Sequence, residues 1–398
     1  MTAALQSSPF LGPVPVAPPT GGLPLLVEYL RRVPDPRRRQ GKRYPLEAIL
    51  LLVVVGTLAG RKHRLGIAEW GRGAEAGLQR ALGFRAGKTP APSTLHEVLR
   101  AVDWAAFAAQ LRAWSLALLA HLDPAQEHAF SCDGKCVRAS LREGAEVAHL
   151  LSVFVHELGL TLDLEPVSTK TNEIPATPKL LLRLPLRGRV VVVDALLTQE
   201  EIAETVVRAG GEYVMPVKGN QPGLQQELQQ VFTQPFPSRW RPETRETYEE
   251  GHGRRELRRL TLVAPPAKVR LQWGWVRQYF LLERVRWTGK AATPERTLVY
   301  GVTSLGRKAA GAERLLGLVR RHWEIENRSH WVRDTLFRED ESRSSHSTLV
   351  QVLTGLRCAA LTLLHTEHRR GKDRSVASLQ RRLEQQPTAI LALTGTLG

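Results

Sequence analysis

The middle of the chain alternates short apolar runs with amphipathic segments. Residues 189–193 (RVVVV) are mostly β-branched, which is typical of a strand buried on both faces. The same type of pattern predicts strands at 128–137, 149–156, 159–164, 189–193, 213–217 and 297–303. Helical periodicity predicts helices at 174–184, 199–209, 224–232, 309–337 and 347–365. Strands that alternate with helices in this way predict an α/β fold, with a mixed sheet flanked by helices on both faces.

A different pattern precedes this region. Residues 1–24 are rich in Pro, Gly and Ala and are predicted to form a flexible lead-in. Helical patterns over residues 25–122 predict a helical N-terminal domain. Its strongest apolar run, 48–59, is shorter than the roughly 20 residues of a membrane span, so a buried helix and no membrane association are expected. The segment 89–100 has an N-cap signal before an amphipathic stretch, and both a DNA-reading helix-turn-helix and an ordinary bundle helix remain open.

The charge balance indicates a polyanionic partner. The 398 residues include 56 Lys and Arg against 39 Asp and Glu, a formal net charge of +17 with a pI near 10.4. This excess favours nucleic acid over general solubilising charge. A basic run at 35–45 fits phosphate contact and a solvated loop equally well, and residues 366–398 are predicted to form a basic, mostly helical tail.

The three cysteines cannot form a closed disulfide framework, and their small number suits a reducing cytoplasm. Cys132 and Cys136 lack a second Cys pair, so zinc is not expected there.

Two aspartates follow predicted strands. Asp133 lies in CDGK at the polar end of an apolar strand, and Asp194 directly follows four valines. Ligands of mixed sheets collect where strands end, so the two carboxylates could meet. Unpaired, they would repel each other, and a divalent cation would relieve the repulsion. A turn or a helix cap is the alternative for either residue alone, above all for Asp194, whereas the two together favour a metal pair.

A polar stripe lies along the predicted helix 309–337. His322, Glu326 and His330 are spaced by four residues and share one face, and Arg333 lies on the same side. The stripe could be a zinc site or a hydrogen-bonded polar face, and it does not match the HExxH pattern.

Seven motifs occur in an order that resembles one family. They are DGK at Asp133, NEIPA at Asn172, VVDALLTQEEI around Asp194, YVMPVKGNQP at Tyr213, GHGRRELR at Gly251, RRHWEIEN ending at Asn327 and HWVRDTLFRED ending at Asp340. With the stretch 35–60, they resemble the H-repeat-associated group of bacterial DDE insertion-sequence transposases over residues 25–365. Each motif alone is weak, whereas the seven in order are highly specific.

The resemblance implies a ribonuclease-H-like catalytic domain over residues 127–365, with a late β-rich insertion at 235–295. It implies that Asp133, Asp194 and Glu326 are the catalytic and metal-binding acids of a DNA transposase, with Asp133 shared between two ions. Such an enzyme cleaves the ends of an insertion element and joins the freed 3′-hydroxyl to target DNA. Oxygen ligands favour Mg²⁺ or Mn²⁺ over zinc, and two such ions about 3.5–4 Å apart can clamp the attacking and leaving oxygens.

The residues around the glutamate depart from the family pattern. Related transposases have Tyr, Arg and Lys seven before, four before and seven after this Glu, where this chain has Val319, His322 and Arg333. His322 and Arg333 keep polar or positive groups, so DNA contact is expected there. The missing Tyr leaves open a transposase-derived protein that binds DNA without cutting it, and a hydrolytic nuclease of the same fold is a further alternative.

DNA contacts are predicted at eight positions. They are Lys218, Asn220, Gln221, His252, Arg254, Arg255, His322 and Arg333. The first three lie in KGNQP after a strand, where a turn with a capping Asn is the alternative. The next three lie in an HGR motif of the insertion, where the alternative is a solvated hairpin. The expected partner is double-stranded DNA, bound by a homo-oligomer associated with the nucleoid in the cytoplasm, with an affinity that falls steeply as salt rises.

Overall fold

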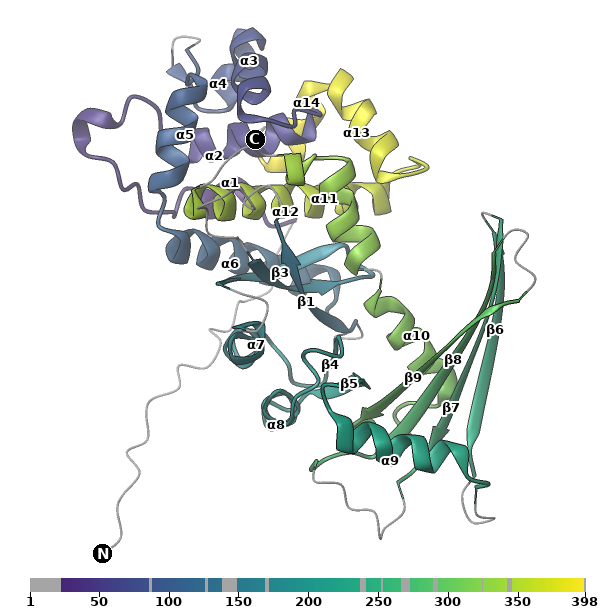
Figure 1. Cartoon of the computed structure of the whole chain (residues 1–398). Helices are drawn as coiled ribbons and strands as arrows, with labels where there is room; N and C mark the ends of the chain where they lie inside the picture. Colours follow the sequence, from purple (N-terminus) through teal and green to yellow (C-terminus); the bar gives the residue numbers. More distant parts are fainter. Residues whose placement is uncertain are drawn as a thin grey trace, which may run out of the picture.

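The computed structural model describes residues 23–85, 88–125, 128–137, 149–168, 172–236, 241–251, 253–265, 273–288, 293–323, 325–341 and 346–396. They form a helical part, a central sheet and a long extension of that sheet (Figure 1). The predicted lead-in lies almost wholly outside the described residues, and so does His252.

One sheet of nine strands runs through the described part of the chain. The strands are β1 (Phe130–Cys136), β2 (His149–Val155), β3 (Leu160–Val167), β4 (Val190–Val193), β5 (Glu212–Val217), β6 (Glu243–Gly251), β7 (Arg254–Val263), β8 (Gln278–Thr288) and β9 (Glu295–Thr303). Their order is β3-β2-β1-β4-β5-β9-β8-β7-β6. β1, β2 and β3 are antiparallel neighbours, whereas β4 pairs in parallel with both β1 and β5. This is the ribonuclease-H-like arrangement, so the predicted fold class is confirmed.

The central strand β4 is covered on both faces. All four of its valines are buried, as the apolar run predicted. Val191 and Val193 belong to the main core, which also contains residues of α7 (Glu173–Leu181) and α8 (Glu200–Arg208). Val190 and Val192 belong to a second core beneath α10 (Ala312–His322). The helices on the two faces therefore hold the carboxyl end of β4, and with it Asp194, in a fixed place.

The insertion continues the central sheet. β9 pairs antiparallel with β5, and β8, β7 and β6 follow it in turn. Helix α9 (Pro222–Thr233) packs beside β9 (Figure 1). Residues 235–295 are thus β-rich as predicted, but the sequence pattern did not predict the individual strands. The reason is visible in β6 (ETRETYEEG), in which no residue is buried and hydrophobic alternation is therefore weak.

The predicted helix at 309–337 is interrupted. α10 ends at His322, a π-helical turn covers Glu326–His330, and α11 spans Trp331–Thr335. π-Turns are rare in proteins and are frequent at functional sites.

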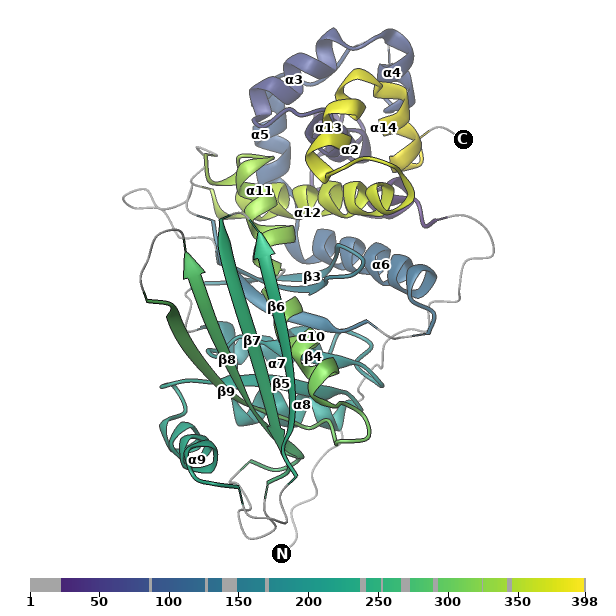
Figure 2. The same cartoon turned by 90° about the vertical axis from the view of Figure 1, so that its right-hand side faces the viewer.

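The helical part is built from both halves of the chain. Its helices are α1 (Leu26–Leu30), α2 (Leu46–Leu58), α3 (Arg64–Gly73), α4 (Ala76–Ala81), α5 (Pro92–Ala101), α6 (Trp104–Leu122), α12 (Ser347–Arg370), α13 (Val376–Gln385) and α14 (Pro387–Thr394). α2 is buried except for Glu47, because α1, α3, α12, α13 and α14 all pack on it. The Gln380 side chain on α13 donates to the Thr57 carbonyl at 2.8 Å. Within residues 366–398, predicted to form a basic, mostly helical tail, α13 and α14 pack on α2, and Figure 2 shows both helices beside it.

Among the described residues, only α12 is long and apolar enough to cross a membrane, and 83% of its apolar window is buried inside the protein. It is therefore a core helix by its packing, and so is α2, whose apolar run predicted a buried helix.

Candidate active site

The two aspartates lie side by side: Asp133 is in the middle of β1, just beyond the last residue that pairs with β4, and Asp194 directly follows β4. β1 and β4 are parallel, and Cys132 is paired with Val193, so Asp133 and Asp194 are the next positions on the two strands. Asp133 Oδ1 accepts from the Gly134 N–H at 2.9 Å, and Asp194 Oδ1 accepts from the Leu197 N–H at 2.9 Å. Asp194 thus makes the turn contact proposed as its alternative role and also faces Asp133.

Glu326 and the two aspartates line one cavity. The cavity has a volume of about 580 Å³. It is lined by Asp133, Gly134, Val192, Val193, Asp194, Ala195, Leu196, Val214, Pro216, Lys218, Asn220, Val299, Val319, His322, Trp323, Ile325, Glu326 and His330. Its walls come from β1, β4, the loops after β4 and β5, and the π-helical turn. Three acids that are distant along the chain therefore open into one space.

The electrostatics of the cavity fit a cation. Burial and then the charge of Asp194 raise the pKa of Asp133 to about 7, with smaller contributions from Glu326 and Glu173 and opposed by the Gly134 N–H. The shift shows that the Asp133 carboxylate is poorly compensated by the protein. Among the described lining residues, Lys218 is the one Lys or Arg, and its side chain is exposed.

The donor set fits a hard divalent ion, but it is not preformed. Within the described ranges, no three His, Cys, Asp or Glu side chains are close enough together to hold a metal ion. The three carboxylates supply the oxygen ligands that Mg²⁺ and Mn²⁺ prefer, and the raised pKa of Asp133 gives the electrostatic reason for a cation. The acids would have to draw together as an ion binds.

The two histidines of the stripe line the cavity with Glu326. Burial lowers the pKa of His322 to about 4. Burial, followed by the charges of Arg333 and Lys135, holds the pKa of His330 well below its usual value. Both rings are therefore neutral at neutral pH. His330 Nδ1 lies 3.7 Å from Asp133 Oδ2, which is too long for a hydrogen bond.

Two residues of this region were absent from the predicted site. The four-residue spacing from Glu326 had already placed His330 on the same helical face as that glutamate. Glu173, in the NEIPA motif, is 3% exposed and packs against Gly134. A Cβ atom on Gly134 would lie 2.1 Å from Glu173 Oε1, so any larger residue at position 134 would have to displace the buried Glu173 carboxylate.

The loop after β5 supports the cavity rim. Lys218 and Asn220 line the cavity, whereas Gln221 does not. The Asn220 amide donates to the Ala195 carbonyl at 2.7 Å, and the Gln221 amide donates to the Thr198 carbonyl at 3.1 Å. These two amides tie the loop after β5 to the loop after β4, which leaves Lys218 as the charged group on the rim.

The remaining predicted DNA contacts lie elsewhere. Arg254 and Arg255 are exposed at the start of β7, outside the cavity, and Arg255 lies over the Trp287 ring at 5.9 Å from its centroid. Arg333 is 1% exposed, and its Nη1 atom lies 3.5 Å from Glu339 Oε2. This burial corrects the expectation for Arg333, because a side chain enclosed in the protein does not reach DNA.

Asp133→Asn is expected to stabilise the metal-free protein increasingly as pH rises. Folding raises the pKa of Asp133 from 3.8 to about 7, so the carboxyl favours the folded state below the unfolded pKa and loses that contribution as pH rises through 7. At roughly 1.4 kcal/mol per pH unit, this rise in the pKa of Asp133 corresponds to at most about 4 kcal/mol of unfolding free energy. Urea unfolding in EDTA at about pH 5 and about pH 8 measures the effect. An equal difference from wild type at both pH values would contradict it.

Family models match both parts of this architecture. One described as "Transposase DDE domain" matches residues 132–363, and one described as "DDE_Tnp_1-associated" matches residues 27–115. The first covers the catalytic sheet, the insertion and most of α12, and the second covers the N-terminal helices.

Several known proteins are similar over most of the chain. The protein named "Putative transposase YncI" of Escherichia coli O157:H7 is 28% identical over 345 residues, covering 85% of this chain and 87% of its own length. The protein named "H repeat-associated putative transposase YhhI" of Escherichia coli strain K12 is 27% identical over 351 residues, covering 85% and 90%. A solved piggyBac transposase synaptic complex with hairpin DNA has 10% identity and a TM-score of 0.44, covering 92% of this chain and 78% of its own. Since the DDE-domain model spans more than half of the residues and relatives of the H-repeat group match most of the length, this chain belongs to the H-repeat-associated family of DDE transposases.

Proposed function

We propose that this chain is an active DNA transposase that cleaves the ends of an insertion element and transfers the resulting 3′-hydroxyl into target DNA. The observation that carries the proposal is the single cavity that Asp133, Asp194 and Glu326 all line. These acids come from three distant segments of a DDE-family domain, and burial together with the charges of Asp194 and Glu326 raises the pKa of Asp133.

Asp133, Asp194 and Glu326 would hold one or two Mg²⁺ or Mn²⁺ ions, with Asp133 shared. Bound there, such ions activate the attacking oxygen and stabilise the leaving oxygen of the phosphodiester. The chain's own contribution is placement. The strand pairing fixes the two aspartates next to each other, and the apolar residues Val192, Val214 and Val299 limit water on one side of the cavity.

The rim of the cavity suits a phosphate. Lys218 is exposed there and lies on a loop that Asn220 and Gln221 hold in place. Its ammonium group would contact the DNA backbone next to the scissile bond, as a non-directional charge. The exposed Arg254 and Arg255 would contact DNA farther away, along the insertion. With a net charge of +17, the chain is suited to binding double-stranded DNA. We propose that it acts on this DNA as a homo-oligomer, at the nucleoid in the cytoplasm.

The experiment that tests this function uses labelled duplexes carrying the inverted repeats that flank the coding region, mixed with unlabelled plasmid. With Mg²⁺ or Mn²⁺, the full chain is expected to nick the label at the repeat end and join it to the plasmid, and EDTA is expected to stop both steps. Cleavage without joined product would identify a hydrolytic nuclease instead. Binding without either product would identify an inactive relative.

A further inference from the structure

A buried ion cluster lies behind the cavity, centred on Glu339 in the short 3₁₀ turn Glu339–Glu341. The Glu339 side chain is fully buried. Its Oε2 atom lies 3.1 Å from Lys135 Nζ and 3.5 Å from Arg333 Nη1, and its Oε1 atom lies 3.7 Å from Arg357 Nη1. The Thr354 hydroxyl donates to Oε1 at 3.0 Å. One carboxylate thus joins β1, α11 and α12.

The charges of this cluster depend on Glu339. Burial alone would raise its pKa, but the charges of Arg333, Lys135 and Arg357 outweigh burial and lower the pKa to about 2. The carboxylate is therefore ionised at any physiological pH. Without it, three almost fully buried cations would lie close together, and Asp334, which is 31% exposed, would be the one carboxylate among the described residues that pairs with any of them.

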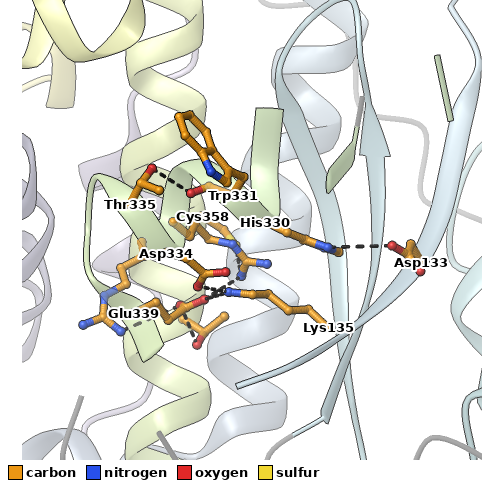
Figure 3. A network of polar contacts seen from close by, with 11 residues as sticks. Asp133, Lys135, His330, Trp331, Asp334, Thr335, Glu339 and Cys358 are labelled. Carbon is orange, nitrogen blue, oxygen red and sulfur yellow. Dashed lines mark hydrogen bonds and ion pairs between the residues drawn. The ribbon is translucent and has the colours of Figure 1, made fainter. Parts of the chain in front are cut away.

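The cluster and the cavity share the same two elements. Asp133 and Lys135 are two positions apart on β1 and so lie on one face of it. His330 and Asp334 are four positions apart on the helical segment that begins with Glu326. His330 faces Asp133, and Asp334 forms an ion pair with Lys135, so two cross-contacts connect strand and helix (Figure 3).

Glu339 strengthens the second of these contacts from behind. Its Oε2 atom binds both Lys135 on the strand and Arg333 on the helix. A shift of the helix along β1 would separate at least one of these pairs and leave a buried charge unpaired, which is costly. A buried ionic group with several partners can in this way specify one register between two elements.

We propose that Glu339 is a positioning residue of the active site, which fixes the helix carrying Glu326 against the strand carrying Asp133. The inference rests on the proposed function, because it concerns how the acids are brought together for a metal ion. Glu339 does not line the cavity and acts only through Lys135 and Arg333.

The test is the affinity of the full chain for Mn²⁺, measured by electron paramagnetic resonance without any DNA cleavage. Glu339→Gln keeps the shape of the side chain and removes its charge. It is expected to weaken Mn²⁺ binding about tenfold or more, as loss of partners that orient metal ligands generally does. The affinity for end DNA is expected to stay within about twofold, because the cations on the surface are unchanged.

Two further variants separate positioning from instability. Lys135→Met leaves Glu339 with its two arginines and Thr354, so the fold is less disturbed, and it is expected to weaken Mn²⁺ binding similarly because the link to β1 is lost. Asp123→Ala breaks a different buried ion pair, with Arg189, and is expected to leave Mn²⁺ affinity unchanged while the protein is folded. All measurements are made below the unfolding transition of each variant.

The outcomes are distinguishable. If wild-type Mn²⁺ binding is abolished by Asp133→Asn but unchanged in folded Glu339→Gln and Lys135→Met, the positioning role is overturned and the proposed function stands. If Asp123→Ala weakens Mn²⁺ binding as much as Glu339→Gln and Lys135→Met do, the effect is general instability and the positioning role is likewise overturned. If the wild type binds no Mn²⁺ that depends on Asp133, the proposed function fails and the inference fails with it.

Discussion

Asp133→Asn is expected to lower the rate of metal-dependent DNA cleavage by about a thousandfold or more, equivalent to about 4 kcal/mol of transition-state free energy. The carboxylate lines the cavity with Asp194, which directly follows the neighbouring strand, and with Glu326, and burial and the charges of both raise its pKa. Asn has nearly the same shape but one oxygen and no charge, so it cannot serve two ions. A single-turnover assay on a labelled element end, with saturating Mg²⁺, measures the loss.

End binding separates this effect from misfolding. Asp133 lies inside the cavity, so Asp133→Asn should leave the affinity for the uncleaved end largely intact in a gel-shift assay. Glu204→Gln, on the exposed part of α8, is a matched control and is expected to cleave at the wild-type rate. Cleavage that survives in Asp133→Asn would rule out the metal assignment.

Asp123→Ala is expected to lower the free energy of unfolding by about 3–5 kcal/mol, because it leaves a buried arginine without its carboxylate. Asp123 follows α6, and its ion-pair partner Arg189 precedes β4; each side chain is 3% exposed. The Arg189 guanidinium also donates to the His128 carbonyl at 3.1 Å and lies 4.9 Å from the Phe130 ring centroid. These contacts hold the charge in place, so the arginine cannot turn to solvent without disturbing the sheet. Urea denaturation measures the difference.

The control is an ion pair of the same chemistry at the surface. Arg208 and Glu204 pair on α8 with side chains 74% and 37% exposed. Glu204→Ala is expected to change the unfolding free energy by no more than about 0.5 kcal/mol, because water screens such pairs. A loss below about 1 kcal/mol in Asp123→Ala would show that the buried pair is dispensable.

Local patterns were enough to predict the parts of the site that lie at strand ends. Four valines identified β4, and the residue after them had to stand at its carboxyl end, where Asp194 is found. The spacing of His322, Glu326 and His330 predicted their common face, which lines the cavity even though a π-turn interrupts the helix. Periodicity survives here because the same side of each helical segment faces the cavity.

Long-range packing could not be read from the sequence. Arg333 is on the predicted side of its helix, but it is buried against Glu339, and nothing in the spacing indicates that a turn six residues later folds back onto it. The strands of the insertion were hidden for another reason. β6 and β7 carry charged residues that pair with one another across the strands, as Arg259 does with Glu246, so no simple apolar alternation marks them.

The burial of α2 by α12, α13 and α14 has a consequence for biosynthesis. About three hundred residues separate α2 from these helices, so a nascent chain exposes the apolar surface of α2 until residues beyond 347 have left the ribosome. During that interval, this surface is open to chaperones and to aggregation with other nascent chains. The helical domain can therefore be completed only after α12 has emerged, which delays DNA binding by the folded domain until translation is nearly finished.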